Sequence, residues 1–93
     1  MIADHPERHR YELEIDGRKA AEIVYRMHGP GAIDLVHTEV KPGFEGQGLG
    51  SKIATFALDD ARKRGLKVIP SCSYIKGFVG KHPEYADLVV SLT

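Results

Sequence analysis

The stretch EGQGLGSK, residues 45–52, decides the fold because it joins an extended segment to a helical one. Gly46, Gly48 and Gly50 alternate along it, so the turn has few side chains and its backbone N–H groups are accessible. At a helix N-terminus such N–H groups and the helix dipole bind phosphate or pyrophosphate. A plain tight turn is the alternative. Two glycines would suffice for it, so a backbone that contacts a ligand explains the third glycine better.

The spacing of these glycines matches neither of two common nucleotide-binding loops. A P-loop requires Gly-Lys-Ser/Thr after four spacer residues, whereas here Lys52 follows Ser51. A dinucleotide fingerprint requires Gly-x-Gly-x-x-Gly and a parallel sheet, whereas here the spacing is Gly-x-Gly-x-Gly. Neither a P-loop nor a dinucleotide-binding fold is therefore predicted.

Three segments before the loop alternate apolar and polar residues, which predicts strands with one buried face. Asp16-Gly17 is a hairpin turn signal, which Arg18-Lys19 lengthens. The third segment is apolar on both faces, which is typical of a central strand. We therefore predict an antiparallel meander of three strands, Tyr11–Ile15, Ala20–His28 and Ile33–Lys41.

The residues after the loop predict a strand–helix–strand crossover. Apolar residues recur at helical spacing from Leu49, and basic residues crowd the last turn before Gly65. A short strand, Lys67–Pro70, follows, and a right-handed crossover makes it parallel to the third strand. Ser73 is expected to cap a second helix, which runs from Tyr74 to about Lys81.

The two ends of the chain complete this prediction. Residues 1–9 are polar and contain Pro6, so we expect a loose terminus, and residues 86–93 predict a final edge strand. No linker or repeat interrupts the chain. The sequence therefore predicts a single α+β domain over residues 1–93, with three antiparallel strands, a β-α-β crossover and a second, C-terminal helix.

Composition excludes several classes of protein. The 93 residues contain 13 Lys and Arg against 13 Asp and Glu, so zero net charge gives no support for nucleic-acid binding. One cysteine permits no internal disulfide, and no apolar run approaches the roughly 20 residues that span a bilayer. The histidines His5, His9 and His28 have no metal-ligand spacing, so we expect no metal. We expect a cytoplasmic protein away from membranes, a monomer or weak homodimer.

The sequence resembles a known family at the loop and the strand before it. HTEV at residues 37–40, followed by GQGLGSK at 46–52, resembles the coenzyme A-binding motif of the GNAT N-acetyltransferase superfamily, Arg/Gln-x-x-Gly-x-Gly/Ala. With PSCSY at 70–74 and KHPEY at 81–85, the chain resembles the small YjdJ-like subfamily over residues 11–89. Glu45 stands where the motif has Arg or Gln, and we expect its carboxylate to turn away from the ligand.

The resemblance implies a minimal GNAT-like fold in which the two parallel strands splay apart and pantetheine enters between them. It implies acetyl-CoA as cofactor and an amine as acceptor, and hence an N-acetyltransferase. A CoA- or acyl-CoA-binding module without turnover is the alternative, because the turn at Asp16-Gly17 replaces the acceptor-site helices of larger relatives. An interaction domain is a third possibility. The cofactor-binding residues implied are Thr38, Glu39, Val40, Gly46, Gln47, Gly48, Leu49, Gly50, Ser51 and Lys52.

Four residues are candidates for the chemistry. Cys72 lies at a predicted helix N-terminus, which favours a nucleophilic thiolate, although a free cysteine also lines pockets. His37 and Glu39 are two apart on a strand, so they share a face as base and partner or as ordinary sheet residues. Tyr74 suits protonation of a leaving thiolate, or packing.

Overall fold

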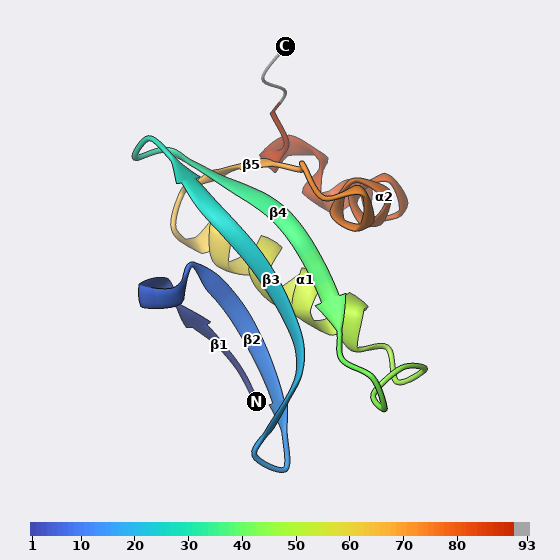
Figure 1. Cartoon of the computed structure of the whole chain (residues 1–93). Helices are drawn as coiled ribbons and strands as arrows, with labels where there is room; N and C mark the ends of the chain where they lie inside the picture. Colours follow the sequence, from blue (N-terminus) through green and yellow to red (C-terminus); the bar gives the residue numbers. More distant parts are fainter. Residues whose placement is uncertain (91–93) are drawn as a thin grey trace.

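Five strands form one sheet in the order β1-β2-β3-β4-β5, and helix α1 lies across one face of it (Figure 1). The computed structural model describes residues 1–90. The strands are β1 (Ile2–His5), β2 (Arg10–Ile15), β3 (Arg18–His28), β4 (Ala32–Val40) and β5 (Lys67–Ile69). The helices are α1 (Leu49–Lys63) and α2 (Ser73–Lys81), with 3₁₀ segments η1 (Pro6–Arg8) and η2 (Pro83–Leu88). The predicted α+β class and the crossover are confirmed.

The first hairpin is tighter than the sequence suggests. Asp16 and Gly17 both have positive φ, which suits a two-residue turn, and β3 begins at once with Arg18 opposite Ile15. The prediction that Arg18-Lys19 lengthens this loop is therefore wrong.

The N-terminal residues form a strand instead of a loose terminus. β1 pairs antiparallel with β2, with Ile2 opposite Leu13. Asp4 accepts a 2.7 Å hydrogen bond from the Tyr25 hydroxyl, which gives a polar strand residue a partner inside the protein. The polar sequence of residues 1–9 does not predict this strand, because no local pattern shows that Asp4 bonds to Tyr25, two strands away in the sheet.

The C-terminal region also differs from the prediction. Helix α2 begins at Ser73, so Cys72 is its N-cap and makes no side-chain capping bond, and the expected Ser73 cap is wrong. In place of an edge strand, residues 83–88 form η2 and Val89 makes a single parallel bridge with Val68. Residues 91–93 of the expected strand lie outside the described residues.

One extra residue in β4 changes the edge that its backbone faces. Val24 pairs with His37 and Tyr25 with Leu35, so Val36 is a β-bulge. Before the bulge, Leu35 C=O accepts a 2.8 Å bond from Cys72 N–H, on the β5 side. After the bulge, Lys41 N–H donates a 2.8 Å hydrogen bond to the C=O of Ala20 in β3.

The bulge leaves two residues of β4 with backbone groups at a free edge. Successive residues of an antiparallel strand direct their backbone groups to alternate sides. Lys41 faces β3, so Thr38 and Val40 face away from it. β5 pairs with β4 in parallel only from Ala32 to Asp34, so it does not reach them. The expected parallel pair is confirmed, and it parts where Figure 1 shows α2 on the side of β4 away from β3.

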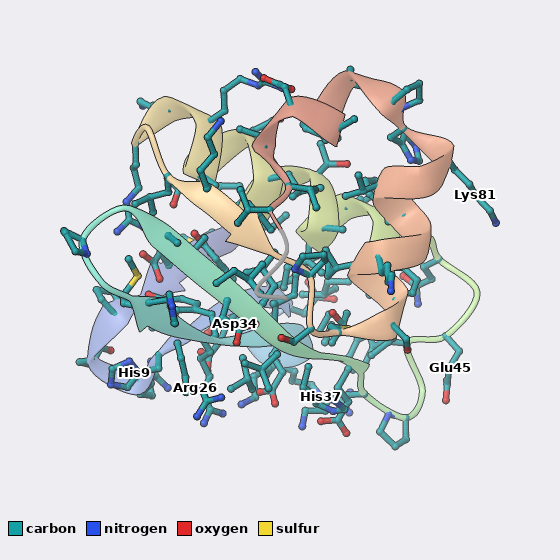
Figure 2. All side chains as sticks on the ribbon, turned by 90° about the horizontal axis from the view of Figure 1, so that it is seen from above. His9, Arg26, Asp34, His37, Glu45 and Lys81 are labelled. Carbon is teal, nitrogen blue, oxygen red and sulfur yellow. The ribbon has the colours of Figure 1, made fainter. Side chains whose placement is uncertain are left out.

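The two faces of the sheet have opposite character. Fully buried Tyr11 faces α1 and donates a 2.7 Å hydrogen bond to Asp60. Burial and this carboxylate raise the pKa of Tyr11 well above its ordinary value. The other face carries charged side chains, and Figure 2 shows Arg26, Asp34 and His37 on it, away from the helices. Among residues 1–90, no helix has the length and apolar character needed to cross a membrane.

Candidate functional site

The glycine loop ends at the N-terminus of α1. Gly48 is the N-cap with φ of 71°, and no side chain caps the helix. The first N–H groups of α1 are therefore available to an anion, where the helix dipole also favours negative charge. Gly46 has φ of 80°, so two of the three glycines are required by a left-handed backbone.

The third glycine lies against the Tyr74 side chain. A Cβ on Gly50 would lie 2.9 Å from the Tyr74 hydroxyl, closer than side chains tolerate. Tyr74 reaches this position from the first turn of α2, so Gly50 allows α2 to approach α1. Gly46 and Gly48 thus have a reason in their backbone conformation and Gly50 has a close neighbour, while our interpretation that ligand contact explains the third glycine stays a prediction.

Glu45 stays within its own loop. Its Oε1 accepts a 2.8 Å hydrogen bond from Gly43 N–H, and Figure 2 shows the side chain at the outside of the loop. The carboxylate thus turns away from the α1 N-terminus, as expected. Its charge is used to hold the turn that precedes the glycines.

Cys72 lies where β4 and β5 part. Its backbone N–H is bonded to Leu35 C=O, and its Sγ is 3.3 Å from the Thr38 Oγ1. The residue is 8% exposed. The structure therefore brings Cys72 together with Thr38, the strand residue whose backbone is free at the opened edge.

His37 and Glu39 lie on the opposite face from this pair. Thr38 is opposite Ile23 on the α1 side, whereas His37 and Glu39 point to the uncovered side. His37 is exposed, and Glu39 Oε1 bonds to Lys41 Nζ at 3.1 Å. The pair shares a face, as the spacing predicts, but the structure does not bring their side chains to the thiol.

The predicted cofactor-binding residues fall into three groups. Among residues 1–90, the backbone groups of Thr38 and Val40 have no backbone partner, whereas Glu39 uses its backbone in the ladder with Glu22. Lys52 extends into a separate surface hollow on α1. The loop and the first turn of α1 contain the rest, namely Gly46, Gln47, Gly48, Leu49, Gly50 and Ser51.

A hollow of about 420 Å³ opens between the N-terminus of α1 and one side of α2. Six of the described residues that line it are Ser51, Tyr74, Gly77, Phe78, Lys81 and His82. From the sequence, Tyr74 and Ser51 are candidates for chemistry and binding, and Lys81 and His82 belong to the quoted segment KHPEY, but Gly77 and Phe78 were missed. The signal was the pair Gly77 and Gly80 inside a nine-residue helix, where glycine is unfavourable.

Two interactions fix the wall of this hollow. Tyr85, in η2, donates a 2.7 Å hydrogen bond to Asp59 of α1, and this bond with burial raises the pKa of Tyr85 to about 12. Arg62 of α1 makes two 3.0 Å bonds with the Asp87 carboxylate. The segment that packs against α2 is thus tied to the helix that bears the glycine loop.

Asp34 is a second residue that sequence reasoning missed. It is 8% exposed, and its Oδ1 has no hydrogen-bond partner among the described residues. Arg26 is its cross-strand neighbour on the uncovered face (Figure 2). The signal was a single acidic residue within the apolar run Ile33–Val36. A buried carboxylate oxygen without a partner is costly, which marks Asp34 for a role beyond packing.

Metal ligands are not clustered in the described part of the chain. Residues 1–90 contain no group of three or more His, Cys, Asp or Glu side chains placed to hold a metal ion. Metal independence stays a prediction.

An uncapped helix N-terminus, a bulged strand with a free edge and a parallel pair that parts together define the class of this α+β domain. Residues 10–88 match the family described as GCN5-related N-acetyl-transferase, and the chain belongs to that family. The resemblance to the GNAT superfamily is confirmed, and the YjdJ-like subfamily stays a prediction.

Relatives support the same assignment. The solution structure of a GCN5-like protein from Staphylococcus aureus superposes with a TM-score of 0.75 at 30% identity, covering 100% of this chain and 90% of that one. Protein NATD1 of Homo sapiens is 32% identical over 82 residues, which is 86% of this chain and 73% of that protein. Protein NATD1 of Xenopus tropicalis is 31% identical over 77 residues, which is 82% of this chain and 71% of that protein.

Gly50→Ala tests the packing of Tyr74 on α1. Alanine favours a helix by about 1 kcal/mol over glycine. In wild type, the contact with Tyr74 should cancel much of that gain. In a Tyr74→Ala background the full gain should appear, as measured by urea unfolding of all four variants. The same change in stability in both backgrounds would show that Tyr74 does not rest on Gly50.

Asp34→Asn tests whether the buried carboxylate is uncompensated. Removing an unpaired buried charge should raise the free energy of unfolding by about 1 kcal/mol. Urea unfolding at neutral pH measures the change, with Arg26→Gln as a control that should have a smaller effect. If Asp34→Asn lowers stability instead, Arg26 compensates the carboxylate in solution.

Proposed function

We propose that this protein transfers the acetyl group of acetyl-CoA to an amine. The observation that carries the proposal is the placement of Cys72 and Thr38 where β4 and β5 part, close to a free strand edge and the α1 N-terminus. Membership of the GCN5-related N-acetyltransferase family supports the same reaction class.

The residues at the opened edge fit the cofactor. Thr38 and Val40 offer backbone N–H and C=O groups that can pair with pantetheine amides, as an added strand would. The N–H groups of the α1 first turn suit the pyrophosphate. Gly77 adds a place where a Cβ would project into the hollow, with nothing within 4 Å of it. Acetyl-CoA supplies an activated acyl group as a thioester.

Cys72 is proposed as the nucleophile. As the thiolate, its sulfur bonds to the acetyl carbon, the carbon–sulfur bond to CoA breaks, and the departing CoA thiolate takes a proton from an acid. The amine nitrogen then attacks the acetyl-cysteine carbonyl, loses a proton to a base, and releases Cys72 as the thiolate. The Thr38 hydroxyl, 3.3 Å from Sγ, can donate a hydrogen bond to that thiolate.

The proposed acid and the proposed base lie on opposite sides of the sheet. Tyr74, with its hydroxyl over Gly50 beside the α1 N-terminus, is proposed as the acid for the leaving thiolate. The acceptor amine is proposed to approach from the uncovered face, where the exposed His37 takes up the ammonium proton before the neutral amine enters between β4 and β5 to reach Cys72. Glu39 is the partner that shares this face, with its charge balanced by Lys41.

A CoA-binding module without turnover is the second candidate. The observation that favours it is the burial of Cys72, which is 8% exposed and already bonded to Thr38. A shielded thiol suits a pocket wall as well as a nucleophile. The two candidates share the cofactor and differ only in chemistry.

Addition of CoA tests both candidates together. At about 100 times its Kd, CoA should stabilise the folded state by ~2.7 kcal/mol. In a domain of this size that corresponds to an increase of roughly 10–20 °C in Tm. Thermal unfolding with and without CoA measures it, with adenosine as the control ligand. An unchanged Tm at saturating CoA would exclude both.

The acetylated cysteine separates them. Intact mass after incubation with acetyl-CoA should show one acetyl adduct in wild type and none in Cys72→Ala. Because Cys72 is the one cysteine in the chain, the adduct can also be followed by loss of the free thiol. Thr38→Val should slow formation of the adduct, since it removes the hydroxyl next to Sγ. A panel of amines then tests CoA release. No adduct and no released CoA would support the binding module.

A further inference from the structure

Asp34 lies at the point where the two parallel strands separate. It pairs with Ile69 of β5, and this is the last residue pair of the β4–β5 ladder. The next residue, Leu35, accepts the hydrogen bond from Cys72 N–H. Figure 2 shows Asp34 on the uncovered face of the sheet, which also carries His37. The Asp34 carboxylate therefore lies beside the opening through which the proposed acceptor amine reaches the thiol.

The charge of Asp34 has no compensating group in the described part of the chain. The residue is 8% exposed, and its Oδ1 has no hydrogen-bond partner within residues 1–90. Arg26 is its cross-strand neighbour, but Arg26 is exposed and forms no ion pair with it among these residues. An uncompensated buried charge is costly, and the charge of a carboxylate is shared by its two oxygens. A cation that the protein binds would therefore offset this cost.

The register of β3 and β4 sets the distance between Asp34 and His37. Asp34 is opposite Arg26 and His37 is opposite Val24, and these two partners are two residues apart on β3. At about 3.4 Å per residue, the two positions on β4 are roughly 7 Å apart. A zigzag chain of about four or five methylenes, with bonds of roughly 1.5 Å, separates two amine nitrogens by a similar distance. One short aliphatic diamine can therefore reach both side chains.

Aliphatic side chains accompany these two polar groups on the uncovered face. Val24 points to this face, because its neighbours Ile23 and Tyr25 belong to the core on the α1 side. Ile69, the partner of Asp34, is 4% exposed and lies outside that core cluster. Apolar side chains suit methylene groups, whereas the backbone of a peptide needs polar partners. The surroundings of Asp34 therefore fit an alkyl chain with a charged end better than a peptide.

We infer that Asp34 anchors a second cationic group of the acceptor, so that the protein prefers a linear aliphatic diamine to a monoamine. One ammonium group lies against the Asp34 carboxylate and keeps its proton. The other loses its proton to His37, enters between β4 and β5 as the neutral amine and becomes the amide. Asp34 is thus a specificity-determining residue, and the product keeps one ammonium. This inference rests on the proposed function, which supplies the reaction and the role of His37.

Acceptor selectivity tests the anchor. CoA release from acetyl-CoA is measured with α,ω-diaminopentane and with pentylamine, which has the same chain and a single amine. Wild type should show about tenfold higher kcat/KM for the diamine, the size of one charge-assisted contact. Asp34→Asn should bring that ratio near one by raising the KM for the diamine, with kcat and the pentylamine values unchanged. A ratio that survives Asp34→Asn overturns the inference.

Two matched variants separate Asp34 from the overall charge of the sheet. Glu14→Gln removes an exposed carboxylate from β2 and should keep the wild-type ratio. Arg26→Gln removes the cation next to Asp34 and should keep or raise the ratio, because a competing positive charge is lost. A ratio near one in either control would assign the selectivity to general charge and overturn the anchor. Urea unfolding checks that each variant is folded.

The length of the diamine gives a measurement that needs no variant. In a series of diamines of increasing chain length, wild-type kcat/KM should peak at about four or five methylenes, the length that joins Asp34 to His37. A kcat/KM that does not depend on length, or equal values for diamine and monoamine, would overturn the anchor while the proposed function stands. Wild type that acetylates no amine would overturn both.

Discussion

The extra residue in β4 is the constraint on which the site depends. Val36 has no partner on β3, and the strand therefore shifts by one residue between Leu35 and His37. Without that shift, His37 and Glu39 would follow Leu35 onto the α1 face, because side chains alternate with a period of two. Thr38 would then leave the α1 face and could not meet Cys72. One inserted residue thus sets both the thiol contact and the face on which the histidine is exposed.

Helix α1 keeps this edge open because it is anchored to structure on both sides. Towards the sheet, Tyr11 donates to Asp60, and Arg64 lies 3.2 Å from Asp60 and 3.5 Å from Asp4 of β1. Towards the C-terminus, the same helix holds η2 because Arg62 donates to Asp87 and Asp59 accepts from Tyr85. The α2 wall and the β4 edge are therefore both placed by contacts to α1. A 93-residue chain can in this way preorganise a site between α2 and the edge of β4.

Periodicity predicts the regular elements of this chain and fails where partners lie far away in sequence. The three antiparallel strands, α1 and the parallel crossover follow from alternation, helical spacing and handedness. β1 does not, because its polar residues are satisfied by Tyr25 and by a backbone ladder. The bulge is also invisible, since Val36 is as apolar as its neighbours. The two-residue spacing of His37 and Glu39 on a strand predicts that they share a face of the sheet. It does not tell whether that face is the one covered by α1.

The glycines of the loop and Gly77 of α2 differ in how strongly they indicate a bound ligand. Gly46 and Gly48 have a left-handed backbone and Gly50 lies against Tyr74, so the alternating glycines of the loop are not by themselves evidence for a ligand. Its capacity to bind an anion rests instead on the uncapped N–H groups of α1. Gly77 is the more informative residue, because it weakens a short helix and neither φ nor packing requires it. A glycine that the folded protein does not need, at the wall of a hollow with aromatic rings and a lysine, is best explained by a molecule that the protein binds.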